Sequence, residues 1–193
     1  MKKIITALML LMLSVPMLMS QSSEEHLKFK GIPITGSKEN FVKELKKQGF
    51  KSSEYEFFDL DGELTQRSCH LNILTTPTSD IVYCVIATYG DLRGWDEVKR
   101  KYEELKEQLK LKYKVTPKCT ESIPEMYEIL HLEENAFINN EAVYESKFEI
   151  KNGTIAIKIA SIENAIFLSL VYGDKEGIAI QKNETNALLQ SDL

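Results

Sequence analysis

The chain has 193 residues, with 24 Lys and Arg against 29 Asp and Glu, and its formal net charge is −5. This acidic balance argues against a nucleic-acid partner, because nucleic-acid binding depends on cations that neutralise phosphates. The length suits one domain or two small ones.

Residues 1–20 are typical of a secretory signal peptide. Lys2 and Lys3 supply the positive start, and an apolar run follows over 4–13. The expected cleavage site is at the small residue Ser20. The apolar run is too short to span a bilayer, which needs about 20 residues. We therefore expect an exported protein, periplasmic or secreted, that has no stable membrane span after cleavage; a retained anchor is the alternative.

Residues 21–35 are expected to form a linker with a short strand, since apolar and polar residues alternate over 26–34. Ser37 is a suitable N-cap and Gly49 a suitable C-terminal stop. The sequence therefore predicts a helix over 38–48.

Three strands are predicted after this helix. The first covers 55–60, and Asp61-Gly62 after it is a hairpin signal between apolar runs. The second is indicated by alternating apolar residues over 69–73, and the third by a nearly continuous apolar run over 81–89.

A second helix over 95–113 gives the strongest pattern in the chain. Its apolar residues recur every three or four positions, as on one face of a helix: Trp95, Val98, Tyr102, Leu105, Leu109 and Tyr113. Such a stripe is typical of a helix that packs on a core.

An irregular insertion is expected over 115–140, with a short helix after Pro124 that carries Met126, Ile129 and Leu130.

Three further strands are predicted over 144–150, 154–161 and 165–172. The isoleucines in the middle strand alternate, which indicates a sheet that is covered on one face. Residues 175–193 show no clear pattern and are interpreted as a tail.

This order of elements predicts an α+β fold of tandem α-β-β-β units, with the helices packed on one face of antiparallel sheet. The first unit covers 36–92, and the second covers 94–174 with the insertion at 115–140. One continuous sheet and two separate sheets are both compatible with this pattern.

The tripeptide Tyr-Gly-Asp closes both units, with Tyr89 and Asp91 in the first and Tyr172 and Asp174 in the second. The plain interpretation is a strand end followed by a turn. The alternative hypothesis is a duplicated contact with a ligand at the surface.

Three cysteines permit one disulfide in an exported chain. Cys69 and Cys84 fall in consecutive strands and would face one another in a hairpin, whereas Cys119 follows the second helix. The pairing among them stays open, and three free thiols are the further alternative.

The chain lacks the motifs of nucleophile elbows, phosphate-binding glycine loops and dinucleotide sites. His26, His70 and His131 are far apart in sequence and lack metal-ligand spacing. The sequence therefore predicts no catalytic residue, metal or cofactor.

Two groups of packing residues resemble a pattern in exported bacterial proteins of unknown function. They are Gly36, Phe41, Val42, Leu45 and Gly49-Phe50 in the first unit, and Trp95, Tyr102-Glu103-Glu104-Leu105-Lys106, Leu109 and Lys112-Tyr113 in the second. The duplicated arrangement is similar to the β-lactamase-inhibitor-protein-like fold. The resemblance implies a binding module without catalytic residues.

The leading hypothesis is a non-enzymatic exported module that binds a protein or envelope component through an exposed sheet face. The alternative is an extracytoplasmic hydrolase with a site of scattered carboxylates and tyrosines. A third hypothesis, an oligomeric structural protein, requires an exposed apolar patch.

Overall fold

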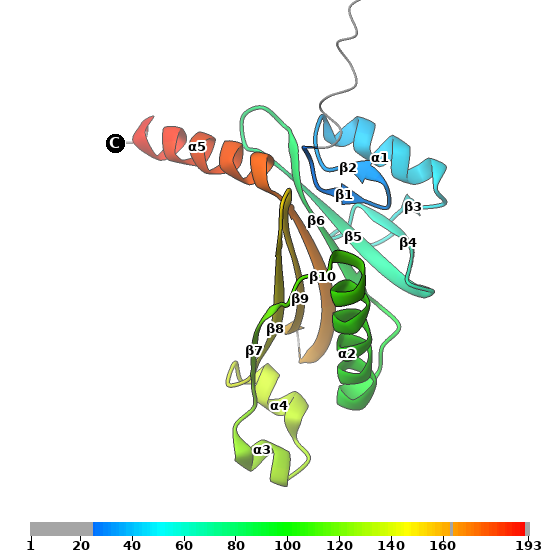
Figure 1. Ribbon diagram of the computed structural model, residues 1–193. Helices are drawn as coiled ribbons and strands as arrows, with labels where there is room; N and C mark the ends of the chain where they lie inside the picture. Colours follow the sequence, from blue (N-terminus) through cyan, green and yellow to red (C-terminus); the bar gives the residue numbers. More distant parts are fainter. Residues whose placement is uncertain (1–24, 163, 192–193) are drawn as a thin grey trace, which may run out of the picture.

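The computed structural model describes residues 25–162 and 164–191, so the predicted signal peptide lies outside the described residues. Eight strands form the main sheet: β3 (Lys51–Ser52), β4 (Leu60–Leu64), β5 (Arg67–Thr75), β6 (Val82–Tyr89), β7 (Lys118–Ser122), β8 (Val143–Ile150), β9 (Gly153–Ile162) and β10 (Ala165–Asp174). Their order is β3-β4-β5-β6-β10-β9-β8-β7, and every pairing is antiparallel (Figure 1).

The described chain also contains five helices and one small sheet. The helices are α1 (Lys38–Lys47), α2 (Gly94–Tyr113), α3 (Glu125–Ile129), α4 (Glu133–Ile138) and α5 (Lys175–Ser191), and the small sheet pairs β1 (Lys28–Phe29) with β2 (Ile32–Pro33). The predicted α+β class is confirmed. None of these helices has both the length and the apolar character needed to cross a membrane.

The strands of 36–92 occupy one half of the main sheet and those of 94–174 the other. β6 pairs with β10 where the halves meet. The halves therefore share one continuous sheet, which decides between the alternatives that the sequence left open.

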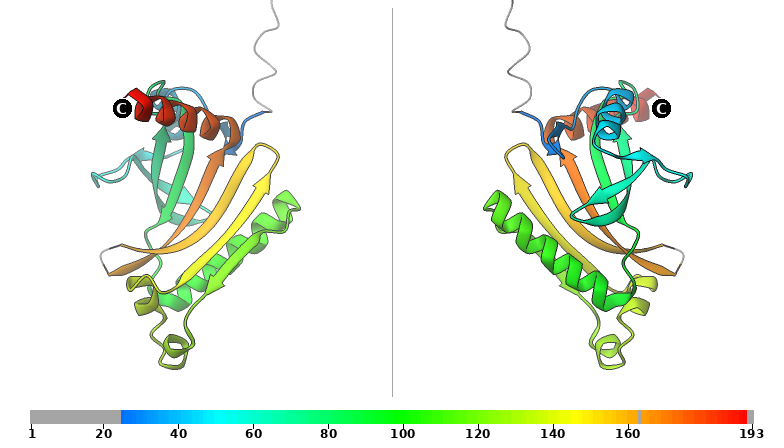
Figure 2. Two further views of the ribbon diagram at one scale, coloured as in Figure 1. Left: turned by 90° about the vertical axis from the view of Figure 1, so that its left-hand side faces the viewer. Right: turned by 90° about the vertical axis from the view of Figure 1, so that its right-hand side faces the viewer.

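Helix α2 is stabilised because its apolar stripe packs on the sheet. Trp95, Val98, Tyr102 and Leu105 are buried against the second half of the sheet. α1 buries Phe41 and Leu45 in the same core. Figures 1 and 2 show α1 and α2 on the same side of the sheet.

The strand register fixes which side chains face these helices. Leu71, Ala87, Leu170 and Ile157 lie opposite one another in adjacent strands, and all four are buried. Because side chains alternate along a strand, the residues next to them point to the other face.

The predicted hairpin at Asp61-Gly62 is wrong, and so is the strand predicted over 55–60. Asp61 and Gly62 lie inside β4, where the ring of Phe50 packs against Gly62 in the space that a Cβ would fill. The turn between β4 and β5 is formed by Thr65 and Gln66, both with positive φ. These are not typical residues for such a turn, so the sequence pointed to the wrong pair.

Three other expectations change in detail. Residues 26–34 form the β1–β2 hairpin, because Lys30 and Gly31 adopt positive φ and reverse the chain. The insertion 115–140 is not irregular, since it contains β7, α3 and α4. The tail 175–193 is largely the helix α5, which long-range contacts stabilise without a clear apolar stripe.

Candidate functional site

The two Tyr-Gly-Asp copies both lie where a strand ends and a helix follows. Tyr89, Tyr172 and Asp174 are buried. Little of these three side chains is therefore available for a contact with a ligand at the surface.

Asp174 is a fully buried helix cap. Its carboxylate accepts hydrogen bonds from the backbone N–H of Gly177 (2.9 Å) and of Leu27 (2.7 Å), and its Oδ2 lies 3.0 Å from His26 Nδ1. Gly177 is the third residue of α5, so the contact is a standard N-cap bond. Asp174 thus joins β10, α5 and the N-terminal hairpin.

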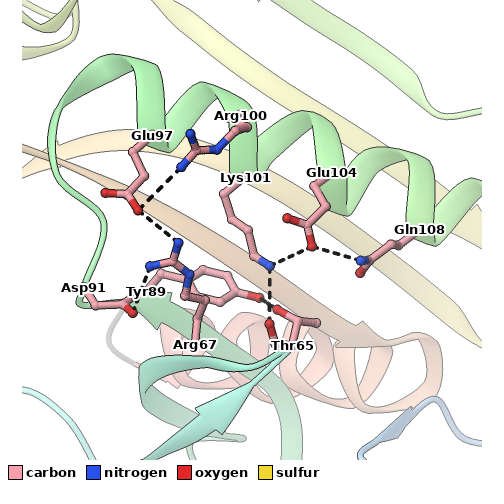
Figure 3. Close-up of polar contacts among 9 residues, drawn as sticks. All are labelled: Thr65, Arg67, Tyr89, Asp91, Glu97, Arg100, Lys101, Glu104 and Gln108. Carbon is pink, nitrogen blue, oxygen red and sulfur yellow. Dashed lines mark hydrogen bonds and ion pairs between the residues drawn. The ribbon is translucent and has the colours of Figure 1, made fainter.

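Asp91 is half-exposed and belongs to an ion-pair network (Figure 3). Arg67 lies 3.3 Å from Asp91 Oδ2 and 3.0 Å from Glu97 Oε1. Its guanidinium therefore links β5 to the segment before α2 and to α2 itself.

Lys101 continues this network along α2. Its ammonium group, nearly buried, lies 2.9 Å from Glu104 Oε1 and 3.3 Å from the carbonyl oxygen of Thr65. Thr65 Oγ1 is also 2.8 Å from the hydroxyl of Tyr89, and burial raises the pKa of Tyr89 to about 12. These contacts fasten the first half of the sheet to α2, which is a structural role.

All three cysteines are free thiols. Cys69 lies opposite Tyr89, and Cys84 lies opposite Leu74, so the predicted juxtaposition of the two cysteines is wrong. Burial raises the pKa of the Cys69 thiol to about 12 and that of Cys84 to about 11. Neither is an activated nucleophile, since activation requires a lowered pKa. Cys119 is exposed on the edge strand β7.

Four carboxyl groups of the described chain have lowered pKa values: Asp61, Glu97, Glu121 and Glu184. The N–H of Arg93 is the main cause for Glu97, and the Ser79 hydroxyl is the main cause for Glu184. Burial would raise the pKa of Asp61 and Glu121, but hydrogen bonds outweigh it. A general acid needs a raised pKa, so these groups do not support the hydrolase hypothesis.

His70 and Asp61 form a close pair, with 2.6 Å between His70 Nδ1 and Asp61 Oδ1. Phe58 stacks on the imidazole with 4.7 Å between ring centroids. The other ring nitrogen, Nε2, faces Gly90 closely enough that a Cβ there would collide with it. The pair joins β4 to β5 within the sheet, and we interpret it as structural.

The face of the sheet opposite α1, α2 and α4, which we call the open face, is the remaining candidate site. One row across its centre is Asn72, Ile86, Val171 and Ala156, again opposite one another in adjacent strands. Ile86 and Val171 keep part of their surface exposed even though they occupy the middle of the sheet. The open face thus has an apolar centre.

The next row of the open face is polar and consists of His70, Thr88, Ser169 and Lys158. Thr88 Oγ1 and Ser169 Oγ are 3.1 Å apart. Phe167 lies two residues before Ser169 in β10, on the same face, and is partly exposed. Apolar residues beside hydrogen-bonding groups are the usual composition of a protein-binding surface.

Two segments border the open face. The loop 53–59 runs beside β5, where Asn72 Nδ2 donates to the carbonyl oxygen of Phe57, whose side chain is 83% exposed. At the other border α5 leaves the end of β10 and extends away from the sheet (Figure 1). A groove of about 420 Å³ lies between α5 and the β8–β9 turn, lined by Thr154, Ile178 and Lys182 among others.

The alternation over 154–161 correctly indicated a sheet covered on one face. The sequence missed the residues of the open face in β6 and β10, because these central strands are apolar on both faces. The outward Ile86, Phe167 and Val171 are indistinguishable in the sequence from inward residues.

The part of the chain that the structure describes contains no group of three or more His, Cys, Asp and Glu residues arranged to hold a metal ion. No protein-family model, curated protein or solved structure matches this chain.

Proposed function

We propose that this protein is an exported, non-enzymatic binding module that recognises a protein or another envelope component through the open face of its sheet. The observation that carries the proposal is the arrangement of Ile86, Val171 and Phe167, which remain partly exposed at the centre of an eight-stranded sheet. The helices α1, α2 and α4 all cover the other face.

The composition of the open face supports a protein partner. It combines branched and aromatic side chains with hydroxyl groups and a lysine, Lys158, and the whole chain is acidic. A strand face of this kind provides a flat, preformed surface whose binding needs little reorganisation.

Two further parts of the proposal rest on sequence patterns. Export is supported by the signal-like residues 1–20. The proposed similarity to the β-lactamase-inhibitor-protein-like fold rests on the sequence order of a helix followed by strands in each unit.

Site-directed photo-crosslinking in the native host tests the open face. A photoreactive residue at Phe167 or Lys158 is expected to capture a partner, and the same residue at Leu111, which is 78% exposed on α2, is the matched control. Adding Val171→Asp should reduce capture at Lys158 about tenfold, since a charge in the apolar centre disfavours docking. Equal capture at Leu111, or capture that Val171→Asp leaves unchanged, would contradict the proposal.

Export is tested separately by determining the N-terminus of the mature protein. Cleavage close to Ser20 supports export, and an intact N-terminus in the cytoplasmic fraction contradicts it.

A further inference from the structure

A second surface lies far from the open face, on the insertion between β7 and β8. Four large apolar side chains are exposed there within seven residues, and we call them the tip patch: Met126 (59%), Ile129 (67%), Leu130 (57%) and Leu132 (43%). Monomeric proteins expose single apolar side chains commonly, but a contiguous group marks an interaction site.

The exposed apolar side chains of α3 face solvent, whereas those of an ordinary surface helix face the core. Met126 and Ile129 have the spacing i and i+3, so they share one face of the helix, and Leu130 is its C-cap. Tyr127 on the other face is buried. The apolar stripe of α2 faces the core, whereas the stripe of α3 faces solvent.

Hydrogen bonds hold the insertion that carries the patch. Tyr127 accepts a hydrogen bond from Asn139 Nδ2 (3.0 Å), and its carbonyl oxygen accepts one from the N–H of Leu132 (2.9 Å). These bonds fold α3 back onto α4.

Helix α4 is in turn fixed to the rest of the protein. Phe137 packs on Trp95 with 5.3 Å between ring centroids, and its carbonyl oxygen accepts a hydrogen bond from Ser161. The carboxylate of Glu134 accepts a hydrogen bond from the backbone N–H of Trp95 at the start of α2. The tip patch is therefore carried by a segment that is anchored to α2 and β9 and projects from the end of the molecule (Figures 1 and 2).

The charge around the tip patch has one sign. Residues 123–141 contain five glutamates and no Lys or Arg: Glu125, Glu128, Glu133, Glu134 and Glu141. Glu125 and Glu128 are exposed on α3 itself, beside the patch. An apolar patch with an acidic border complements an apolar strip that is flanked by cations.

We infer that the tip patch docks onto a basic amphipathic surface of a partner protein, an apolar strip flanked by Lys or Arg. An anionic membrane is disfavoured because its headgroups repel Glu125 and Glu128. A second copy of this chain is disfavoured because its net charge has the same sign. This surface is separate from the open face, and neither proposal depends on the other.

The test uses the complete mature chain and a labelled helical peptide with leucines on one face and lysines on the other as the probe. Fluorescence anisotropy measures the affinity. We expect the double variant Ile129→Gln/Leu130→Gln to weaken binding about tenfold, because exposed apolar anchors carry most of the binding energy. The control Leu111→Gln removes an equally exposed leucine outside the tip patch and should stay within about twofold of the parent.

Charge is tested with Glu125→Gln/Glu128→Gln and with a matched peptide that has glutamates in place of lysines. The variant should bind the lysine peptide about fivefold more weakly, and the glutamate peptide should not bind. Equal binding of the two peptides overturns the inference, as does equal affinity of the tip variant and the Leu111 control.

Two other measurements test whether a membrane or a second copy of this chain binds the tip patch. Binding to phosphatidylglycerol vesicles that the tip variant loses would assign the patch to a membrane. Self-association in sedimentation that the tip variant loses would assign it to a second copy. Either result overturns the inference, and near-UV circular dichroism of each variant verifies its fold.

Discussion

The two Tyr-Gly-Asp junctions have the same sequence but different structures. At the second junction Asp174 is 0% exposed and accepts two backbone N–H groups. At the first junction the side chain of Asp91 is 35% exposed, pairs with Arg67, and leaves its Oδ1 buried without a partner among the described residues.

The distance to the next helix explains the difference. α5 begins directly after Asp174, which puts the carboxylate within reach of the third helical N–H. α2 begins three residues after Asp91, and other carboxylates bind its N-terminus: Glu134 accepts a hydrogen bond from the N–H of Trp95, and Glu97 accepts one from the N–H of the N-cap residue Arg93. An identical tripeptide therefore acts as a helix cap in one place and as an ion-pair partner in the other.

The largest expected effect separates the two aspartates. Asp174→Ala should lower the free energy of unfolding by about 3 kcal/mol, because it leaves buried N–H groups unsatisfied. Asp91→Ala should cost about 1 kcal/mol or less, as for other half-exposed ion pairs. Urea denaturation of both variants measures this, and equal losses would contradict the distinction.

The glycines should show the reverse order. Gly90→Ala places a Cβ 2.6 Å from His70 Nε2, in a ring held by Phe58 and Asp61, and should cost about 2 kcal/mol. Gly173→Ala meets only the terminal carbon of Ile178 and should cost about 1 kcal/mol, because that side chain can shift. Thermal unfolding compares them, and a more destabilising change at Gly173 would refute the steric argument.

Removing the two tyrosine hydroxyls should give losses of stability that differ less than those at the two glycines. Tyr89→Phe removes the hydrogen bond with Thr65 and should cost about 1 kcal/mol. Tyr172→Phe keeps the edge-to-face contact with Phe29, so we expect a change below about 0.5 kcal/mol. Chemical denaturation decides this, and a larger loss at Tyr172 would indicate an important hydroxyl contact there.

The smallest effect concerns acid stability at the first junction. The N–H of Arg93 and the charge of Arg67 lower the pKa of Glu97. Its contribution to stability is therefore complete above the pKa of an unfolded glutamate and is lost as the pH falls through the lower pKa of the folded state. Glu97→Gln should flatten the decline in unfolding midpoint between about pH 5 and pH 3, and an unchanged slope would exclude this contribution.

Local patterns predicted the regular elements well. The stripe of α2 and the alternation of β5 and β9 were correct, because each residue's facing direction repeats with the period of its element. The hairpin at Asp61-Gly62 was wrong because the packing of Phe50 on Gly62 requires a strand there. Helix α5 was missed because Asp174 and the contact of Glu184 with the 78–79 backbone stabilise it from other parts of the chain.

The candidate sites depended more strongly on tertiary structure. The sequence indicated a one-sided sheet and an asymmetric insertion at 115–140. It could not show that Ile86, Val171 and Phe167 face outward, because both faces of a central strand are apolar. Met126 and Ile129 were correctly assigned to a helix, of which Leu130 is the C-cap, but their direction depends on Tyr127 being the residue that packs inward.

The sequence by itself thus determined the α+β class, most of the elements and the two positions where a Tyr-Gly-Asp ends a strand. Only the tertiary structure decided what each Tyr-Gly-Asp does, since the role of a carboxylate depends on which groups surround it in space. The same holds for the open face and the tip patch: periodicity specifies that a residue lies on a face, and packing specifies whether that face is buried.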